Sequence, residues 1–502
     1  MENNRGSFGT RAGFIMAAIG SAIGLGNIWR FPAVAYENGG GAFFLPYLFA
    51  LLTAGIPILI LEFTMGHKYR GSSPLTFARF RKNTEWLGWW QVGVSFVIAT
   101  YYSVIIAWAG SFAYFSIGER WGEDPEAFFF GEYLKATAPG EFGGIEPKVF
   151  FPLLIVWAVT LGVLFKGVKK GIEAANKIMI PALVVLFLVI VVRALTLDGA
   201  IQGLDAFFKP EWGLMSDPKV WMAAYGQIFF SLSIGFAIMI TYSSYLPKKT
   251  DLTNSAFITG FANSGFELLA GIGVFAALGF MAQQQGVAVS EVVGSGIGLA
   301  FIVFPKIISS FPAFNGFFGF AFFGCLVLAG LTSLISIVET FVSGVQDKFK
   351  VSRTKSVLFG GGAAALISVV YSTRTGINIL DTVDYFINSF GVTLAGLIQV
   401  ILVAWIFREV KSLQDHANAV SDIRIGAWWR ISLSIITPIV LGFMTYQNIA
   451  SNVKENYGGY PDGFIAIAGW GVAAAALIAG FIFMAIKWKN DAETSIDSKE
   501  VS

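Results

Sequence analysis

The feature that most constrains this chain is a succession of apolar stretches, each long enough to cross a membrane as a helix. About 20 apolar residues span the hydrocarbon core of a bilayer, and in that core a helix satisfies its own backbone hydrogen bonds. Of the 502 residues, 55% are hydrophobic and 13% are charged, too few charges for the surface of a soluble protein of this length. The pattern predicts an all-α polytopic membrane protein with about twelve spans, near residues 12–36, 42–65, 88–116, 149–166, 172–194, 221–245, 256–283, 315–345, 357–373, 380–407, 426–449 and 463–487.

Lysine and arginine gather in alternate loops. Basic residues precede the first expected span and follow the second, fourth, sixth, eighth and tenth, whereas the loop 119–146 is acidic. Because cytoplasmic loops carry the excess of basic residues, both termini are expected in the cytoplasm of a multi-pass plasma-membrane protein. The stretch 296–314 is partly apolar, but counting it as a span would move the basic loop 348–355 outside. It is therefore expected to form short helices in an extracellular loop.

The remaining composition argues against several other classes. The net charge of +2 gives no indication of a nucleic-acid partner, and the single cysteine, Cys325, allows no intrachain disulfide. The first span lacks a signal-peptide cleavage pattern and is expected to be retained. His67 and His416 fall in predicted cytoplasmic loops, and no nucleophile is paired with a base inside the spans. An enzyme is therefore not expected.

Two expected spans contain residues that interrupt a helix near mid-membrane. The first holds the stretch 21–27, SAIGLGN, followed by Arg30, and the sixth holds Ser231, Ser233 and Gly235. Glycine weakens a helix, and hydrocarbon offers no partner to the backbone groups that a break sets free. Each break is therefore expected to surround a polar solute or an ion.

The breaks also have a plainer explanation. Gly20 and Gly24 alone would make a helix-packing face of small residues, and the serines of the sixth span could bond back to the preceding turn. Asn27 and Arg30 in the same helix, and a second break in register with the first, favour discontinuous helices 1 and 6.

The two breaks occupy corresponding positions if spans one to five and six to ten are two repeats. An odd number of spans per repeat inserts the second upside down, and paired broken helices mark the binding site in such transporters. The expected organisation is a 5+5 inverted repeat, with residues 1–194 as the first repeat, 195–410 as the second, and 411–502 as spans eleven and twelve with a cytoplasmic C-terminal tail.

Several motifs, spread over ten spans, resemble those of one family. They are GLGNIWRFP at 24–32, ENGGGAFFLPY at 37–47, ATYY at 99–102, QIFFSLSIGF at 227–236, Asn263 with Glu267, and AGLTS at 329–333. In these the chain resembles the neurotransmitter:sodium symporters, in particular their bacterial amino-acid transporters with the leucine-transporter fold. Paired broken helices are known from this same family, so the repeat argument and the resemblance are not independent.

The resemblance implies two sodium sites and no organic cofactor. The first would use the substrate carboxylate, the carbonyl of Ala22 and the side chains of Asn27, Ser231 and Asn263. The second would use the carbonyls of Gly20, Ile23 and Ala329 and the hydroxyls of Thr332 and Ser333. Ser231 stands where many relatives carry threonine, which keeps the oxygen. Without the AGLTS context, Thr332 and Ser333 would be interpreted as ordinary interhelical hydrogen-bonding residues.

The resemblance also implies the substrate site. Backbone amides at Leu25 and Gly26, at the start of a half-helix, would bind a carboxylate together with the Tyr102 hydroxyl. The amino group would bind Ser233 and carbonyls of the sixth span. The residues expected around the substrate are Ser21, Gly24, Leu25, Gly26, Ile98, Tyr102, Phe230, Ser231, Ser233, Phe236, Ser333 and Ile337.

Two positions bear on the choice of substrate. Relatives that carry monoamines place an aspartate where this chain has Gly24, so glycine there favours an α-amino acid. Ala237 stands where leucine-transporting relatives have glycine, and an added methyl in a packed pocket disfavours bulk. Small to medium neutral amino acids, glycine through leucine, are expected.

Glu267 is expected to replace a bound chloride. In chloride-dependent relatives a small polar residue stands at this position beside the anion, with Tyr47, Gln227 and Ser231 at the other matching positions. A carboxylate supplies the negative charge itself, which predicts chloride-independent transport. Protonation of Glu267 on return of the empty carrier would give proton counter-transport. The alternative is a buried glutamate with a purely structural pairing.

Gates and a hinge follow from the same resemblance. Arg30 and Asp384 match the extracellular gate, and Phe236 would close over the substrate. Arg5 and Asp347, with Tyr245, match the intracellular network, and Phe8 departs from the tryptophan usual there. Gly171 and Pro181 bracket a segment expected to unwind and release the second sodium; a proline kink in a packed helix is the plain alternative.

The predicted function is sodium-coupled symport of a neutral amino acid by alternating access, in a protein that is a monomer or weak dimer in the lipid bilayer. A nutrient sensor with a transporter fold would bind the same ligands without moving them. A channel would need a continuous polar lining, whereas the polar residues here concentrate at mid-membrane.

Overall fold

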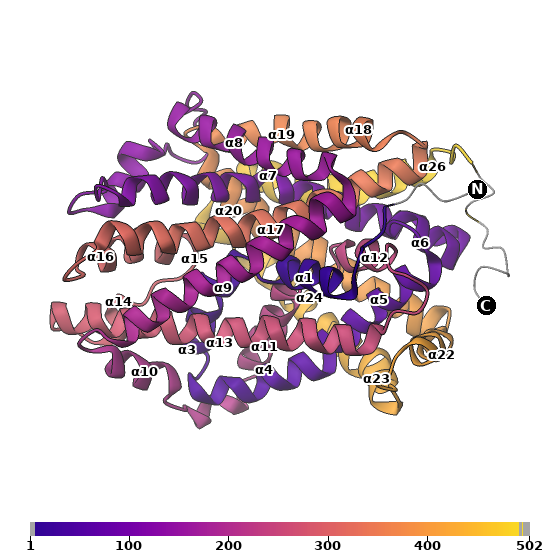
Figure 1. Cartoon of the computed structure of the whole chain (residues 1–502), viewed down its shortest axis with the longest axis horizontal. Helices are drawn as coiled ribbons and strands as arrows, with labels where there is room; N and C mark the ends of the chain where they lie inside the picture. Colours follow the sequence, from indigo (N-terminus) through magenta and orange to yellow (C-terminus); the bar gives the residue numbers. More distant parts are fainter. Residues whose placement is uncertain (1–5, 491–493, 495–502) are drawn as a thin grey trace.

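The computed structural model describes residues 6–490 and 494, and this part of the chain is almost entirely helical (Figure 1). Its only strand-like pairings are two isolated bridges, Gly40 with Pro210 and Ile145 with Thr373. The all-α class predicted from the apolar stretches is confirmed.

The first span is broken in two. Helix α1 (Arg11–Ala22) begins at Thr10, whose hydroxyl accepts a hydrogen bond from the Gly13 amide at 3.0 Å. After an extended Gly24 the chain resumes in α2 (Leu25–Trp29) and α3 (Phe31–Glu37), and the two halves are bent by 56°.

The sixth span is broken as well. Helix α11 (Pro218–Ser231) ends where the predicted interruption begins, and α12 (Ile238–Ser243) follows after six residues. Within this gap Ser233, Gly235 and Ala237 have φ values of 53°, 82° and 63°. Left-handed backbone of this kind ends a helix, and it is costly for a residue with a side chain.

Ten further helices in the described part of the chain are long and apolar enough to cross a membrane. With the two broken spans they account for the twelve expected. They are Gly41–Tyr69 with α4 (Phe44–Ala50) and α5 (Ile56–Tyr69), Lys82–Ser116 with α7 (Glu85–Ser116), α8 (Pro147–Phe165), Val168–Leu195 with α9 (Ala174–Leu195), α13 (Leu252–Gln285), α17 (Asn315–Phe349), Arg353–Ser372 with α18 (Arg353–Ser356) and α19 (Gly362–Ser368), Gly376–Ile406 with α20 (Gly376–Phe386) and α21 (Thr393–Ile401), Ala427–Gly459 with α23 (Ala427–Ile431) and α24 (Thr437–Lys454), and Asp462–Ala485 with α25 (Asp462–Phe464) and α26 (Val472–Ala485).

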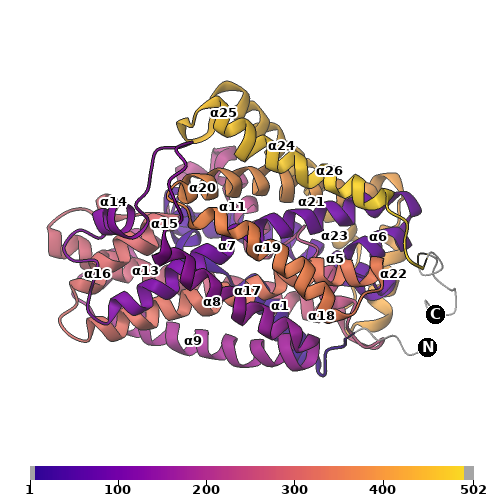
Figure 2. The same cartoon turned by 90° about the horizontal axis from the view of Figure 1, so that it is seen from above.

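Shorter helices cap the two ends of the molecule. The helix Gly296–Ser309, with α15 (Gly296–Gly298) and α16 (Phe304–Ser309), is too short to span, as predicted for this loop. It lies with α10 (Ala200–Phe208) and α14 (Val289–Val292) at one end, whereas α6 (Ser73–Phe80), α22 (Val410–Val420) and the last turn of α26 lie at the other, called here the terminal end (Figures 1 and 2).

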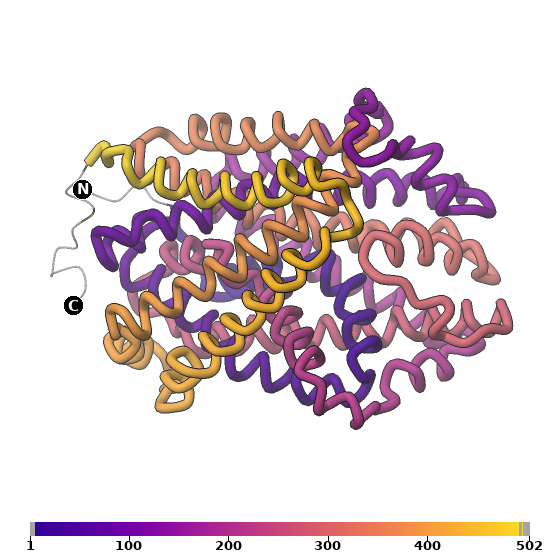
Figure 3. The backbone as a smooth tube through the Cα atoms, turned by 180° about the vertical axis from the view of Figure 1, so that it is seen from behind, coloured from indigo at the N-terminus to yellow at the C-terminus, as the bar shows by residue number. Residues whose placement is uncertain are grey.

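The spans form an inner and an outer group. In α7, α13 and α17, 78% of the most apolar stretch is buried within the protein, against 28% in the span of α9 and 33% in α8. The C-terminal helices lie across the outside of the bundle (Figure 3). Outer helices expose large apolar side chains such as Phe151 and Ile178, which suits contact with lipid. The broken helices lie among the inner ones.

The two histidines meet at the terminal end. Nδ1 of His67, at the end of α5, lies 3.0 Å from Nε2 of His416 on α22, and Nε2 of His67 lies 3.0 Å from the Pro247 carbonyl oxygen. This contact ties the second span to α22 and to the segment after α12.

Candidate functional site

The two broken helices face each other at mid-span. The Ser233 hydroxyl donates a hydrogen bond to the Ser21 carbonyl oxygen at 3.0 Å, although 212 residues separate them. The Ser21 side chain is buried, and its hydroxyl has no partner among the described residues. Backbone and side-chain polar groups of both breaks are therefore gathered in one buried place.

Asn27 connects the first break to α13. Its side-chain oxygen accepts the Gly24 amide at 2.8 Å, and its side-chain NH2 donates to the side-chain oxygen of Asn263 at 2.8 Å. Asn263 in turn donates to the Ser231 hydroxyl at 3.0 Å. Three residues expected at the first sodium site are thus adjacent. Ala22, which was expected to contribute its carbonyl, is buried and is the last residue of α1.

Ser333 of α17 lies against the opened end of α1. Its Oγ is 3.4 Å from the carbonyl oxygens of Gly20 and Ser21 and 3.5 Å from that of Ile23. One hydroxyl proton cannot satisfy three carbonyls, which leaves oxygen atoms for another ligand. The Thr332 hydroxyl donates to the Ala329 carbonyl at 3.0 Å. Oxygen atoms are the ligands that a hard cation prefers, so both oxygen clusters are chemically suited to sodium.

The start of α2 meets Tyr102 of α7. The Leu25 amide donates to the Tyr102 hydroxyl at 3.1 Å. A Cβ on Gly24 would lie 3.0 Å from that hydroxyl oxygen and 3.2 Å from Ser333 Oγ. A Cβ on Gly26 would run into the Phe230 ring. Gly24 therefore leaves space at the polar end of the predicted substrate site, and Gly26 allows the Phe230 ring to pack against the backbone.

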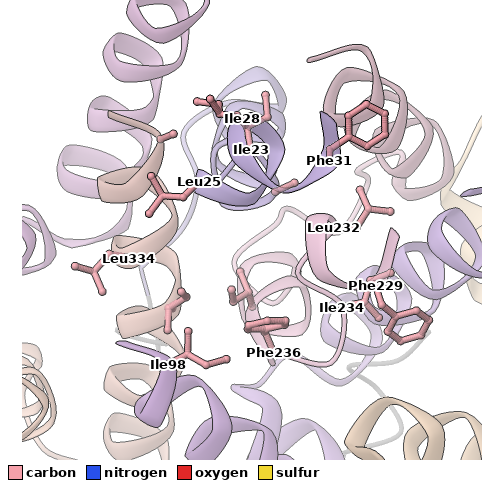
Figure 4. Close-up of a cluster of buried hydrophobic side chains, with 14 of the residues drawn as sticks. Ile23, Leu25, Ile28, Phe31, Ile98, Phe229, Leu232, Ile234, Phe236 and Leu334 are labelled. Carbon is pink, nitrogen blue, oxygen red and sulfur yellow. The ribbon is translucent and has the colours of Figure 1, made fainter. Parts of the chain in front are cut away.

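Apolar side chains line the other side of the break. Ile98, Phe236 and Ile337 are all buried, and the Ser95 hydroxyl fixes the Phe236 carbonyl at 2.6 Å. Figure 4 shows Ile98 and Phe236 among the buried apolar side chains around the broken helices, with Leu25 and Ile23 on the first break. The arrangement offers a polar end and an apolar side, as an amino acid with a hydrocarbon side chain would need.

Glu267 is fully buried on α13. The Tyr47 hydroxyl donates to its Oε2, and the Gln227 side-chain NH2 donates to its Oε1 at 2.6 Å. Tyr47 also lies 2.8 Å from the Ser264 hydroxyl. The carboxyl is therefore held by neutral hydrogen-bond donors, and it has no ion-pair partner within 4 Å among the described residues.

The predicted outer gate is not a direct ion pair. Asp384 accepts hydrogen bonds from the Tyr101 hydroxyl at 2.6 Å and from the Asn388 side chain at 2.9 Å. The Arg30 guanidinium instead lies over the Phe230 ring, 4.6 Å from its centroid. Whether Arg30 and Asp384 act as the predicted gate stays a prediction, and Phe230 lies beside Arg30 in this region.

The predicted inner network is described only in part, because Arg5 lies outside the described residues. Asp347 accepts the Ser72 amide at 2.8 Å. The Tyr245 hydroxyl donates to Glu339 at 2.7 Å, and Arg353 binds both oxygens of that carboxylate, at 3.0 and 2.7 Å. Glu339 and Arg353 belong to none of the motifs recognised in the sequence and were not predicted.

The phenyl ring of Phe8 makes edge contacts with three aromatic rings near the inner network, those of Phe14, Tyr242 and Tyr245. The side chain is buried. A phenyl group is therefore well packed at the position where relatives have tryptophan.

The predicted hinge lies beside the opened end of α1. Gly171 sits in a π-helical turn, Val168–Glu173, close to the Val163 carbonyl, and Pro181 lies inside α9. Between them Asn176 is buried against Gly20, and its Oδ1 has no partner in the described part of the chain. A movement of this segment would act directly on the oxygen cluster at Ser333.

Glu62 is a further site residue that the sequence analysis missed. Its Oε1 accepts the Gly235 amide at 3.0 Å and the Gln399 side chain at 3.4 Å, and the residue is fully buried. It thereby satisfies a backbone donor of the second break. A carboxylate within the apolar run 42–65 was the available signal, because ionisable residues at membrane depth are costly and mark functional sites.

A family model and individual relatives assign the chain to the same family. The model of the sodium:neurotransmitter symporter family matches residues 5–128 and 121–491. An uncharacterised sodium-dependent transporter of Methanocaldococcus jannaschii is 40% identical over 96% of this chain and 98% of its own length. The human sodium- and chloride-dependent neutral and basic amino acid transporter B(0+) is 28% identical over 93% of this chain and 83% of its own.

A solved structure agrees with the sequence relatives. MhsT in complex with L-phenylalanine superimposes with a TM-score of 0.75 at 33% identity, covering 88% of this chain and 99% of that one. The protein is accordingly an integral membrane transporter and not an enzyme, and the chain belongs to the sodium:neurotransmitter symporter family.

Proposed function

We propose that the protein is a sodium-coupled symporter of small to medium neutral amino acids that works by alternating access. The observation that carries this proposal is the meeting of the two broken helices, joined by the Ser233–Ser21 and Asn27–Asn263–Ser231 hydrogen bonds. Oxygen ligands for cations, a half-helix start beside the Tyr102 hydroxyl for a carboxylate, and an apolar wall lie there within one buried region.

Two sodium ions provide the driving force in this proposal. One sits at Asn27, Asn263 and Ser231 and shares the substrate carboxylate. The other sits at the carbonyls facing Ser333. Each sodium that enters with its charge contributes roughly 2.3 kcal/mol per 100 mV of membrane potential, so two can drive strong accumulation.

Orientation and pathway complete the proposal. Both termini face the cytoplasm, residues 1–194 and 195–410 form the inverted repeats, and residues 411–502 lie outside them. Arg30 with Asp384 closes the site from outside, and the Asp347 and Tyr245 region closes it from inside. The buried Glu267 carboxyl supports transport without chloride, with a proton carried back on Glu267.

Uptake into proteoliposomes tests this function. A sodium gradient, with potassium as the control cation, should drive accumulation of labelled alanine, valine or leucine with chloride or gluconate outside. Competition should rank these amino acids above tryptophan. Saturable, sodium-dependent binding without any uptake would instead identify a nutrient sensor, and absence of both would refute the proposal.

A further inference from the structure

A large cavity lies away from the broken helices, between α7, α8 and α17. Its volume is about 790 Å³, within the range of sites that hold small organic ligands. These three helices pack against one another and lie side by side in Figures 1 and 2. Ile155 and Val159 of α8 line the cavity and are exposed at the surface of the bundle, so the cavity opens sideways, toward the lipid side of the bundle.

The floor of the cavity is formed by Gly110. This residue is exposed although it lies within the mostly buried helix α7. A Cβ built there meets its first neighbour, Val327 Cγ2, only at 3.9 Å. The absence of a side chain on α7 therefore keeps the floor of the cavity open, and a larger residue there would narrow it.

The length of the cavity matches one leaflet. Its lining runs from residue 106 to residue 115 on α7 and from 148 to 159 on α8. At 1.5 Å per residue these stretches extend about 15 Å, half of the roughly 30 Å hydrocarbon core. They start at the end of the helices opposite the terminal end. The cavity is thus an apolar slot as deep as one acyl chain.

The mouth of the slot is positively charged. Arg120 and Lys148 line it, both are exposed, and among the described residues no acidic side chain lines it. The Arg120 guanidinium is positioned on Tyr114, 4.4 Å from the ring centroid and 2.9 Å from the hydroxyl oxygen. Lys148 has no ion pair within the described part of the chain. Two cations above an apolar slot complement an anionic head group carrying a hydrocarbon chain.

We propose that this slot is a binding site for an anionic phospholipid. The phosphate is held between Arg120 and Lys148, and one acyl chain passes over Gly110 toward Val327 and Leu331. The lipid belongs to the extracellular leaflet, an assignment that rests on the proposed orientation of the termini.

The site shares a helix with the second proposed sodium site. Val327 and Leu331 lie one turn apart on one face of α17, and Ala329 and Ser333 lie about 200° around the helix from them. The bound chain therefore packs on the back of the segment whose front faces the carbonyls of α1. The bound lipid and the second sodium ion would therefore contact opposite faces of the same two turns of α17, residues 327–333.

Lipid retention by the full chain tests the proposal. The purified protein is equilibrated with vesicles of phosphatidylethanolamine and phosphatidylglycerol at 3:1, and retained lipids are counted by native mass spectrometry. The wild type should retain one phosphatidylglycerol in preference to phosphatidylethanolamine. Arg120→Gln and Lys148→Gln should each weaken that preference roughly fivefold, and the double variant about 25-fold, the effect of one or two cationic contacts at a lipid surface.

Two further variants separate the slot from general surface charge. Gly110→Leu leaves both cations in place but fills the floor, and should abolish the retained lipid. Lys219→Gln removes an exposed lysine at the same end of the molecule, outside the cavity, and should change nothing. Equal retention of the two lipids by the wild type, or unchanged retention in both Gly110→Leu and the double variant, overturns the proposal. A dimer without retained lipid would show that a second copy covers the slot, and would overturn it too.

Discussion

Gln227 and Glu267 are held together by a hydrogen bond of 2.6 Å, so that a neutral amide of α11 supports a buried carboxylate of α13 just beside the second break. In the proposed function, Glu267 provides there, as part of the protein, a negative charge in place of a bound chloride. The donors around it, Tyr47 and Gln227, are those that an anion would also use.

Replacing Glu267 by serine should make transport depend on chloride. The substitution removes the fixed charge and leaves Tyr47 and Gln227 free to bind an anion. Sodium-driven uptake by this variant should be low in gluconate and restored by chloride. Uptake by the wild type should be the same in both anions. Glu339→Gln changes a buried carboxylate elsewhere and should create no chloride response. Chloride-insensitive uptake by Glu267→Ser would contradict the assigned role.

Asn263→Ala should weaken sodium binding. Its side chain joins Asn27 to Ser231, and its loss removes one hydrogen-bond partner from each of these buried side chains, at a cost of about 1–3 kcal/mol. Sodium-dependent substrate binding, measured by scintillation proximity, should shift to a sodium concentration higher by about tenfold or more. Thr259→Ala, one turn away on the same helix with its hydroxyl bonded back to Ser255, should leave the sodium dependence unchanged.

Ala237→Gly should stabilise the protein. Ala237 has φ +63°, a strain of about 1–2 kcal/mol for a residue with a side chain, whereas the added freedom of glycine in the unfolded state costs about 0.4–1 kcal/mol. The net gain of roughly 0.5–1 kcal/mol should appear as a higher melting temperature. Phenylalanine should also compete better relative to alanine.

The matched control for that variant is Ala224→Gly, within helix α11. A helical position gains nothing from glycine and should lose about 1 kcal/mol. Equal shifts in melting temperature for the two variants would show that the backbone at Ala237 is not strained.

Acidification should destabilise the terminal end through His416. Burial, with the nearby charges of Lys68 and Arg70, lowers the pKa of His416 from 6.5 to about 4. Between these values the unfolded chain binds a proton that the folded protein does not, so stability is lost as the pH falls below about 6.5. Because His416 is partly exposed, the loss at pH 5 should be about 1 kcal/mol. His416→Gln should weaken the dependence of melting temperature on pH, with the neighbouring His67 still present, whereas Asp415→Asn should not weaken it.

Lys348→Met should be strongly destabilising. Lys348 and Glu85 form a buried ion pair, and the Trp488 indole donates to the same carboxylate at 2.8 Å. Removing one partner leaves an unpaired buried charge, which costs about 3–5 kcal/mol. Thermal unfolding should detect the loss, and the double variant Lys348→Met/Glu85→Leu should recover most of it. No recovery would mean that packing, rather than the charge, dominates there.

Much of the fold was predictable because hydrocarbon imposes simple rules. The length and apolarity of the spans predicted their number, and the interruptions at 24–27 and 231–235 predicted the two broken helices. The stretch 296–314 was correctly predicted not to span the membrane, because an extra span would have reversed the distribution of charged loops; its helix, Gly296–Ser309, is short.

Other features depend on which residues meet in space, and the sequence does not contain that information in local form. Glu62 lies 173 residues from Gly235, whose amide it accepts. The Glu339–Arg353 pair likewise joins α17 to the start of α18. An isolated ionisable residue in an apolar run signals that a partner exists, but only the packing of the helices identifies it.

The contact between His67 and His416 gives the protein a built-in reporter. The chain has two imidazoles, and both lie in the same joint between α5, α22 and the segment that follows α12. Isotope-labelled histidine would therefore yield a spectrum with no background from elsewhere, and any sliding of the second span against α22 during the transport cycle would appear as a change in the only two signals.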